Sequence, residues 1–151
     1  MGYINNLRKY VGNSPLIMVA CGAIIMKGSE ILLQKREDNG LWGFHGGALE
    51  PGESFEDTVK RELFEELGIT VTKCHLFKSY SGKDFYFKYP NGDEVYIIDN
   101  IFIIDEYKGN FNIDKNEVLE LKWFNVNEIP WDDVVFHNAL ILKEYFKTLE
   151  L

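Results

Sequence analysis

The stretch from Gly47 to Ile69, GALEPGESFEDTVKRELFEELGI, decides the fold of this chain of 151 residues. Its sequence predicts a helix over residues 55–67. Ser54 is a favourable N-cap, because its hydroxyl can accept a hydrogen bond from a backbone N–H of the first helical turn. Gly68 predicts the end of the helix, since glycine readily adopts the left-handed conformation that closes many helices.

Three glutamates of the expected helix indicate a metal site. At about 100° per residue, Glu62, Glu65 and Glu66 share one sector of about 100° and crowd their negative charges together. A cation among them would relieve the repulsion, and hard oxygen ligands suit Mg²⁺ or Mn²⁺. The sector borders the apolar stripe that must pack into the core, which comprises Phe55, Val59, Leu63 and Leu67.

A glutamate-rich helix is more often only a solvated surface, so the residues around it decide between the two interpretations. Gly46 and Gly47 allow a close backbone approach, and they can present amide and carbonyl groups to a metal-bound phosphate. Arg61 either forms an ordinary ion pair with Glu53 or uses that pair to hold the site in shape. Together these residues favour the metal site.

The remainder of the chain predicts a mixture of strands and helices without regular βαβ alternation. We therefore expect an α+β protein, with an α/β/α layered sandwich around a mixed sheet, formed as a single domain by residues 1–151. The first two strands should form a hairpin that turns at residues 27–29. The expected strands are 17–26, 30–36, 70–80, 84–90, 94–105 and 119–125, and two further helices are expected at 3–11 and 132–149.

Composition excludes several classes of protein. The 16 Lys and Arg residues against 24 Asp and Glu residues give a net charge of −8, which argues against nucleic-acid coating and predicts no DNA partner. The apolar run from Leu16 to Met26 is far shorter than the roughly 20 residues of a membrane-spanning helix. Cys21 and Cys74 are most simply interpreted as free thiols, which predicts a cytoplasmic protein.

The spacing of the central stretch resembles the Nudix box in full, from Gly47 through Arg61 to Ile69. The resemblance implies a Nudix-like fold and a pyrophosphohydrolase that cleaves a nucleoside diphosphate linked to another group with a metal-activated water. It implies Mg²⁺, or Mn²⁺, as the cofactor. The metal ligands it implies are Glu62, Glu65 and Glu66, with the Gly46 carbonyl as a possible fourth.

The resemblance leaves the general base open, because this role varies within the family. Glu62, Glu53 and Glu117 are the candidates, and Glu120 is a secondary one. Glu117 precedes Trp123 by six residues, which matches the position where such an acid often lies. The expected catalytic residues are therefore Glu53, Arg61, Glu62 and Glu117.

Residues around the glycine-rich loop are candidates for substrate binding. Arg36 could clamp a phosphate with its planar guanidinium, or it could be an ordinary surface residue. Trp42 or Phe44 could stack on a base, although aromatic residues beside such a loop more often pack in the core. His45 stands where the family commonly has proline; it could contact a phosphate, but a solvent-facing loop histidine is the stronger expectation.

Two other functions are compatible with the same fold. A nucleotide sensor without catalytic activity would usually show eroded carboxylates or an attached DNA-binding domain. An isomerase of diphosphate substrates would need an additional catalytic cysteine and glutamate. The intact box favours the hydrolase, with a small nucleotide such as a nucleoside triphosphate or ADP-ribose as substrate, and with either a monomer or a homodimer as its state.

Overall fold

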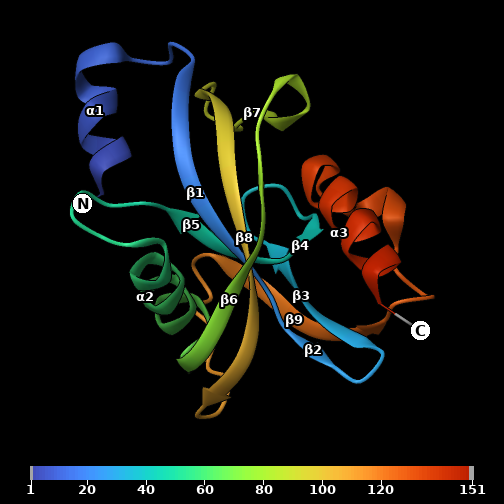
Figure 1. The fold of residues 1–151 in the computed structure, drawn as a ribbon. Helices are drawn as coiled ribbons and strands as arrows, with labels where there is room; N and C mark the ends of the chain where they lie inside the picture. The colour runs from blue at the N-terminus through green and yellow to red at the C-terminus, as the bar shows by residue number, and fades with distance from the viewer. Residues whose placement is uncertain (1, 150–151) are drawn as a thin grey trace.

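The computed structural model describes residues 2–149. It contains one mixed sheet, one antiparallel sheet and three α-helices (Figure 1). Strands β1 and β8 pair in parallel, and every other strand pair is antiparallel. The first sheet has the order β5-β1-β8-β6, with β7 paired to β8, and the second has the order β2-β3-β4, with β9 paired to β3. The strands are β1 (Leu16–Ile24), β2 (Met26–Lys27), β3 (Glu30–Arg36), β4 (Trp42–Gly43), β5 (His45–Ala48), β6 (Thr70–Tyr80), β7 (Tyr86–Lys88), β8 (Glu94–Lys108) and β9 (Val118–Asn125).

The helices cover the sheets from opposite sides, as Figure 1 shows for α2 and α3. Helix α2 (Phe55–Leu67) packs on one buried apolar cluster, and α3 (Phe136–Thr148) packs on another. Strand β1 contributes to both, because its side chains alternate between the two faces of the sheet. Met18 and Ala20 belong to the α3 cluster, whereas Cys21 belongs to the α2 cluster. The α/β/α layering expected from the sequence is therefore confirmed.

The helices also agree with the sequence in type and number. Helix α1 (Tyr3–Val11) ends at Gly12, as expected. Among residues 2–149, no helix combines the length and the apolar character needed to cross a membrane. Helix α3 begins four residues later than expected. Trp131–Asp133 form a short 3₁₀ helix, and Val134 and Val135 are then kept extended because Val134 bridges Trp42 and the Val135 N–H donates to the Trp42 carbonyl.

The expected hairpin of residues 17–36 exists only at its turn. Met26 pairs with Ile31 and Lys27 with Glu30, but strand β1 ends at Ile24 and belongs to the other sheet. The chain thus leaves one sheet and enters the second within two residues. This crossing brings β3 and the loop that follows it towards the carboxylate face of α2.

Candidate active site

Helix α2 has the boundaries that its caps predict. The Ser54 hydroxyl accepts a hydrogen bond from the Asp57 N–H, and the Asp57 carboxylate accepts one from the Ser54 N–H. At the other end Gly68 adopts a left-handed conformation with φ of 72°. Val59, Leu63 and Leu67 are fully buried, which fixes the rotation of the helix and turns its glutamate sector towards strand β5.

The two glycines of β5 permit the close approach between this strand and its neighbours. At Gly46, φ is 142°, and a Cβ there would collide with the carbonyl oxygen of Cys21. At Gly47, a Cβ would collide with the carboxylate of Glu62. Gly46 is therefore needed for its backbone conformation and its close approach to Cys21, and Gly47 is needed to make room for Glu62.

Arg61 organises the carboxylates of the helix through its guanidinium. It donates to both oxygens of Glu53, at 2.6 and 2.9 Å, and to the Ala48 carbonyl at 3.0 Å. Its Nη1 donates to Glu62 at 2.8 Å and to Glu65 at 3.4 Å. The hydrogen bonds from Arg61 lower the pKa of Glu53 to about 2, so Glu53 stays ionised and fixes Arg61 in place.

Glu62 and Glu66 are carboxylates held in a poorly solvated position. Burial raises the pKa of Glu62, and it raises the pKa of Glu66 well above its ordinary range. Glu66 is 4% exposed and accepts a hydrogen bond from the Gly46 N–H at 3.2 Å. Repulsion between the two carboxylates adds to the rise for Glu66. A cation bound here would therefore be strongly favoured.

Glu117 reaches the same place from a distant part of the sequence. The segment 109–117 is tied to the end of α2, since the N–H of Asp114 donates to the Glu66 carbonyl at 3.0 Å. Burial raises the pKa of Glu117, and the charge of Glu65 contributes. Glu120, by contrast, is exposed, pairs with Lys35 across the strands and does not line the cavity.

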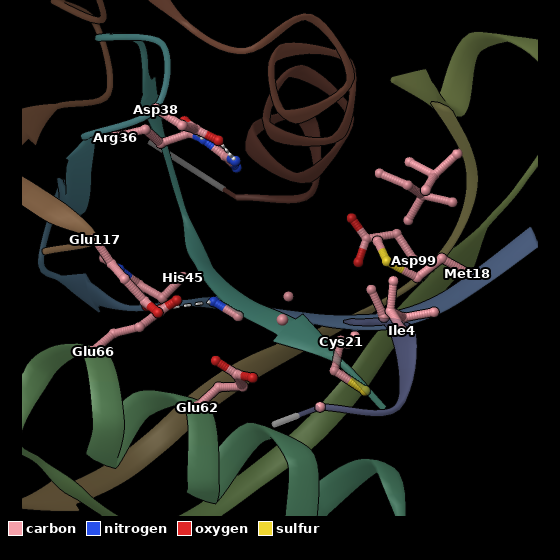
Figure 2. A pocket seen from close by; sticks show the side chains of 18 of the residues that line it. Ile4, Met18, Cys21, Arg36, Asp38, His45, Glu62, Glu66, Asp99 and Glu117 are labelled. Atoms are coloured by element: carbon pink, nitrogen blue, oxygen red, sulfur yellow. Dashed lines mark hydrogen bonds and ion pairs between the residues drawn. The ribbon is translucent and has the colours of Figure 1, made fainter. Parts of the chain in front are cut away.

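These groups line one side of a cavity of about 770 Å³. Figure 2 shows Glu66 and Glu117 close together near His45, with Glu62 beside them above helix α2. Glu65 stands at its mouth with a side chain that is 55% exposed. The structure thus brings together the sequence-derived residues Gly46, Glu62, Glu65, Glu66, Arg61 and Glu117.

The donor set fits a hard divalent cation, because it consists of carboxylates and backbone carbonyls. Within residues 2–149, no three His, Cys, Asp or Glu side chains are already grouped closely enough to hold an ion. Arg61 draws Glu62 and Glu65 to itself, as its hydrogen bonds show. Binding of a cation would therefore require these side chains to turn from Arg61 towards Glu66.

The predicted substrate-binding residues are placed differently from one another. Arg36 lines the cavity but already donates to both oxygens of Asp38, at 2.9 and 2.6 Å, and lies over the ring of Phe87. Phe44 lines the cavity and is only 8% exposed. Trp42 packs edge-on against Phe124 and does not line the cavity.

His45 corrects the expectation of a solvent-facing side chain. It is 1% exposed, with Nδ1 at 3.0 Å from Gln34 Oε1 and Nε2 at 3.0 Å from the Leu32 carbonyl. Burial lowers its pKa to about 4. Both ring nitrogens are occupied inside the fold, so the ring ties β5 to β3 and is not available to a phosphate.

Comparison with known proteins identifies the family to which this chain belongs. The NUDIX domain model matches residues 16–144. The chain belongs to the Nudix family. Its curated relatives are named as a pyrophosphatase and as hydrolases, and the chain is a Nudix hydrolase.

Two curated relatives of this Nudix hydrolase illustrate the range. It is 33% identical over 132 residues to the ADP-ribose pyrophosphatase of Methanocaldococcus jannaschii, covering 85% of this chain and 73% of the relative. It is 34% identical over 130 residues to an NAD-capped RNA hydrolase of Mannheimia succiniciproducens, covering 82% of this chain. The chain spans only 43% of that second relative's length.

Solved structures agree with the fold. The MutT Nudix hydrolase of Burkholderia pseudomallei superposes with a TM-score of 0.72 at 27% identity, covering 86% of this chain and 97% of the other. The MutT protein of Methanosarcina mazei superposes with a TM-score of 0.70 at 19% identity, which supports the fold alone.

The cavity of this Nudix hydrolase also contains residues that sequence reasoning missed. Asp99, His137 and Asn138 are buried and line it, and Arg8 of α1 lines it as well. One signal was available for Asp99. It interrupts the apolar run of β8 at a position that alternation assigns to the same face as Val95 and Ile97.

Proposed function

We propose that this Nudix hydrolase is a Mg²⁺-dependent pyrophosphohydrolase of small nucleotides. One observation supports this most strongly: Glu62, Glu65 and Glu66 line one wall of a cavity together with Glu117, and Arg61 donates hydrogen bonds to Glu62 and Glu65. Mn²⁺ would serve the same ligands. The cavity of about 770 Å³ lies in the size range of small-molecule sites.

Each residue of the wall has a proposed role that follows from its contacts. Glu62, Glu65 and Glu66 would hold the metal, with the Gly46 carbonyl beside them. A divalent cation at this place neutralises phosphate oxygens and lowers the pKa of a bound water. Glu53 keeps Arg61 in position through two hydrogen bonds.

Glu117 is the proposed general base. Its raised pKa makes this carboxylate a stronger base than an ordinary glutamate, so that it accepts a proton from water more readily. It lines the cavity from a loop rather than from α2, so it can face a water from a different direction than the metal ligands do. A proton taken from that water would reside on a carboxylate oxygen of Glu117.

The proposed substrate is a nucleoside diphosphate linked to another group. ADP-ribose is such a compound, and a relative at 33% identity is named an ADP-ribose pyrophosphatase. Nucleoside triphosphates share the same pyrophosphate linkage. The net charge of −8 makes a long nucleic acid a poor partner. Cys21 and Cys74 are both free thiols, which agrees with the cytoplasmic location that we propose.

A substrate panel tests this function. The purified protein is incubated with Mg²⁺ or Mn²⁺ and nucleoside triphosphates, ADP-ribose, other nucleotide sugars or dinucleoside polyphosphates, and the products are separated by chromatography. We expect metal-dependent cleavage at a pyrophosphate bond, lost in Glu65→Gln. Tight nucleotide binding without cleavage of any compound would contradict the proposal and favour a nucleotide sensor.

A further inference from the structure

Asp99 lies in the cavity at a distance from the carboxylates of α2. It belongs to β8, is 5% exposed and lines the cavity. Figure 2 shows it beside Met18, across the open space from Glu66 and Glu117. Within residues 2–149 its carboxyl group takes part in no hydrogen bond or ion pair, and its strand partners Ala20 and Tyr80 offer it none.

Two further polar side chains line the cavity and also lack a hydrogen-bond partner among the described residues. His137 and Asn138, from the first turn of α3, are 7% and 5% exposed. Neither side chain has a hydrogen-bond partner within the described part of the chain, and the rings of Phe85 and Phe87 flank His137. Asn138 reaches into the space that the absent side chain of Gly43 leaves open.

Side chains this deeply enclosed usually have a protein partner for their polar atoms, whereas the polar atoms of these three side chains open onto the cavity. A single one can be a local accident of packing. Here three such groups, from β8 and α3, line one cavity that the glutamates of α2 also line. They are therefore best explained as groups that a ligand completes.

The chemistry around Asp99 restricts which part of a nucleotide could bind there. The neighbouring walls are apolar, since Met18, Phe44, Val95 and Ile97 line the same cavity. A carboxylate without a cationic partner repels phosphate. A flat apolar group with hydrogen-bond donors on its edge fits both the walls and the carboxylate. Nucleobases have this character, and those with an amino group present such donors.

We propose that this end of the cavity binds the nucleobase and that Asp99 selects bases bearing an exocyclic amino group. The inference builds on the proposed function, because it names the part of the nucleotide that points away from the acidic wall. A carboxylate accepts a hydrogen bond from an amino group, whereas an oxo group in that place presents an acceptor to an acceptor. His137 and Asn138 supply further contacts to the edge of the base.

The test measures binding of nucleoside monophosphates, which contain no pyrophosphate bond to cleave. Calorimetry in Mg²⁺ at pH 8 compares GMP with IMP, AMP with IMP, and CMP with UMP. At this pH most Asp99 is ionised, since burial raises its pKa to about 7. Hydrogen bonds to charged groups suggest at least about tenfold tighter binding of the amino-bearing member in at least one of these pairs.

Variants assign the preference to Asp99. Asp99→Asn should reduce each ratio to below about threefold, because an amide can both donate and accept. Glu106→Gln, at an exposed position of the same strand outside the cavity, should retain the wild-type ratios. Circular dichroism confirms that each variant is folded, and the wild-type comparison requires no variant at all.

The outcomes separate this inference from the proposed function. Equal affinities within every pair, no binding by any monophosphate, or an unchanged preference in Asp99→Asn would each overturn the inference. Hydrolysis of nucleotides without base preference would leave the proposed function standing and remove the selection by Asp99. A base preference without hydrolysis of any nucleotide would support Asp99 and contradict the hydrolase.

Discussion

At the α2 end of the cavity, the carboxylates of Glu62 and Glu65 accept hydrogen bonds from the guanidinium of Arg61, which also donates to Glu53 outside the cavity lining. At the other end, the carboxyl group of Asp99 is buried without any partner in the described residues. At the first end the protein itself supplies partners to the carboxylates. The second is complete only when something else binds. The difference indicates where the cavity positions reacting groups and where it selects a ligand.

The largest effect that distinguishes the two ends of the cavity is expected at Asp99. Burial raises the pKa of this carboxyl group from 3.8 to about 7. Between these values the folded protein holds a proton that the unfolded chain has lost, so the stability falls as the pH rises from about 4 to about 7. Asp99→Asn should therefore be more stable than the wild type above pH 7, by up to about 4 kcal/mol.

Urea unfolding between pH 4 and pH 8 measures this effect. The advantage of Asp99→Asn should shrink towards pH 4, where the carboxyl group of the folded wild type is protonated and that of the unfolded chain is only partly ionised. Glu106→Gln on the same strand serves as the exposed control, with little change in stability. A stability difference for Asp99→Asn that does not vary with pH would show that this carboxyl group is not desolvated.

The next largest effect belongs to the acidic wall. Glu66→Gln should lower turnover at least about 100-fold, by analogy with the loss of other catalytic electrostatic groups. Its fold should remain intact or become slightly more stable without metal, because a repelled buried charge is removed. Steady-state kinetics with Mg²⁺ and thermal unfolding measure the two quantities. Glu56→Gln, exposed on the same helix, is the control.

Glu117 sharpens the assignment of the base. Glu117→Gln should lower kcat by about 100-fold, the lower range of general-base contributions. Glu120→Gln, whose parent residue is exposed outside the cavity, should retain activity. If Glu117→Gln turns over at the wild-type rate, the base is Glu53 or Glu62.

The smallest effect is expected at Gly47. In Gly47→Ala the new methyl group would displace the flexible end of Glu62, so we expect about a tenfold loss of turnover with little loss of stability. Gly46→Ala should instead destabilise the fold, since its clash is with the Cys21 backbone and φ is 142°. Thermal unfolding and kinetics of both variants test the contrast. Equal melting temperatures for the two variants would contradict it.

The acidic wall could be predicted from sequence because its main parts are local. Helix α2 fixes the spacing of Glu62, Glu65 and Glu66, and its caps fix the boundaries. Glu117 could be proposed only through the resemblance to a family. It enters the cavity because a loop docks on the carbonyl of Glu66, which no local pattern shows.

The other end of the cavity could not be predicted in the same way. Asp99 and Asn138 lie on β8 and α3, and only the packing of those elements brings them to one cavity. His45 was misplaced for a related reason. Its sequence neighbours are those of a loop, but β5 lies beside β1, and the ring is enclosed with Gln34 and Leu32.

Binding of Mn²⁺, followed by electron paramagnetic resonance, tests most directly whether the acidic wall is the metal centre. The wild type should bind Mn²⁺, and Asp99→Asn should bind it with the same affinity. The double variant Glu62→Gln, Glu66→Gln should bind it at least about 100-fold more weakly, since hard cations need carboxylate ligands. Equal affinities of the wild type and the double variant for Mn²⁺ would show that the acidic wall is not the metal centre.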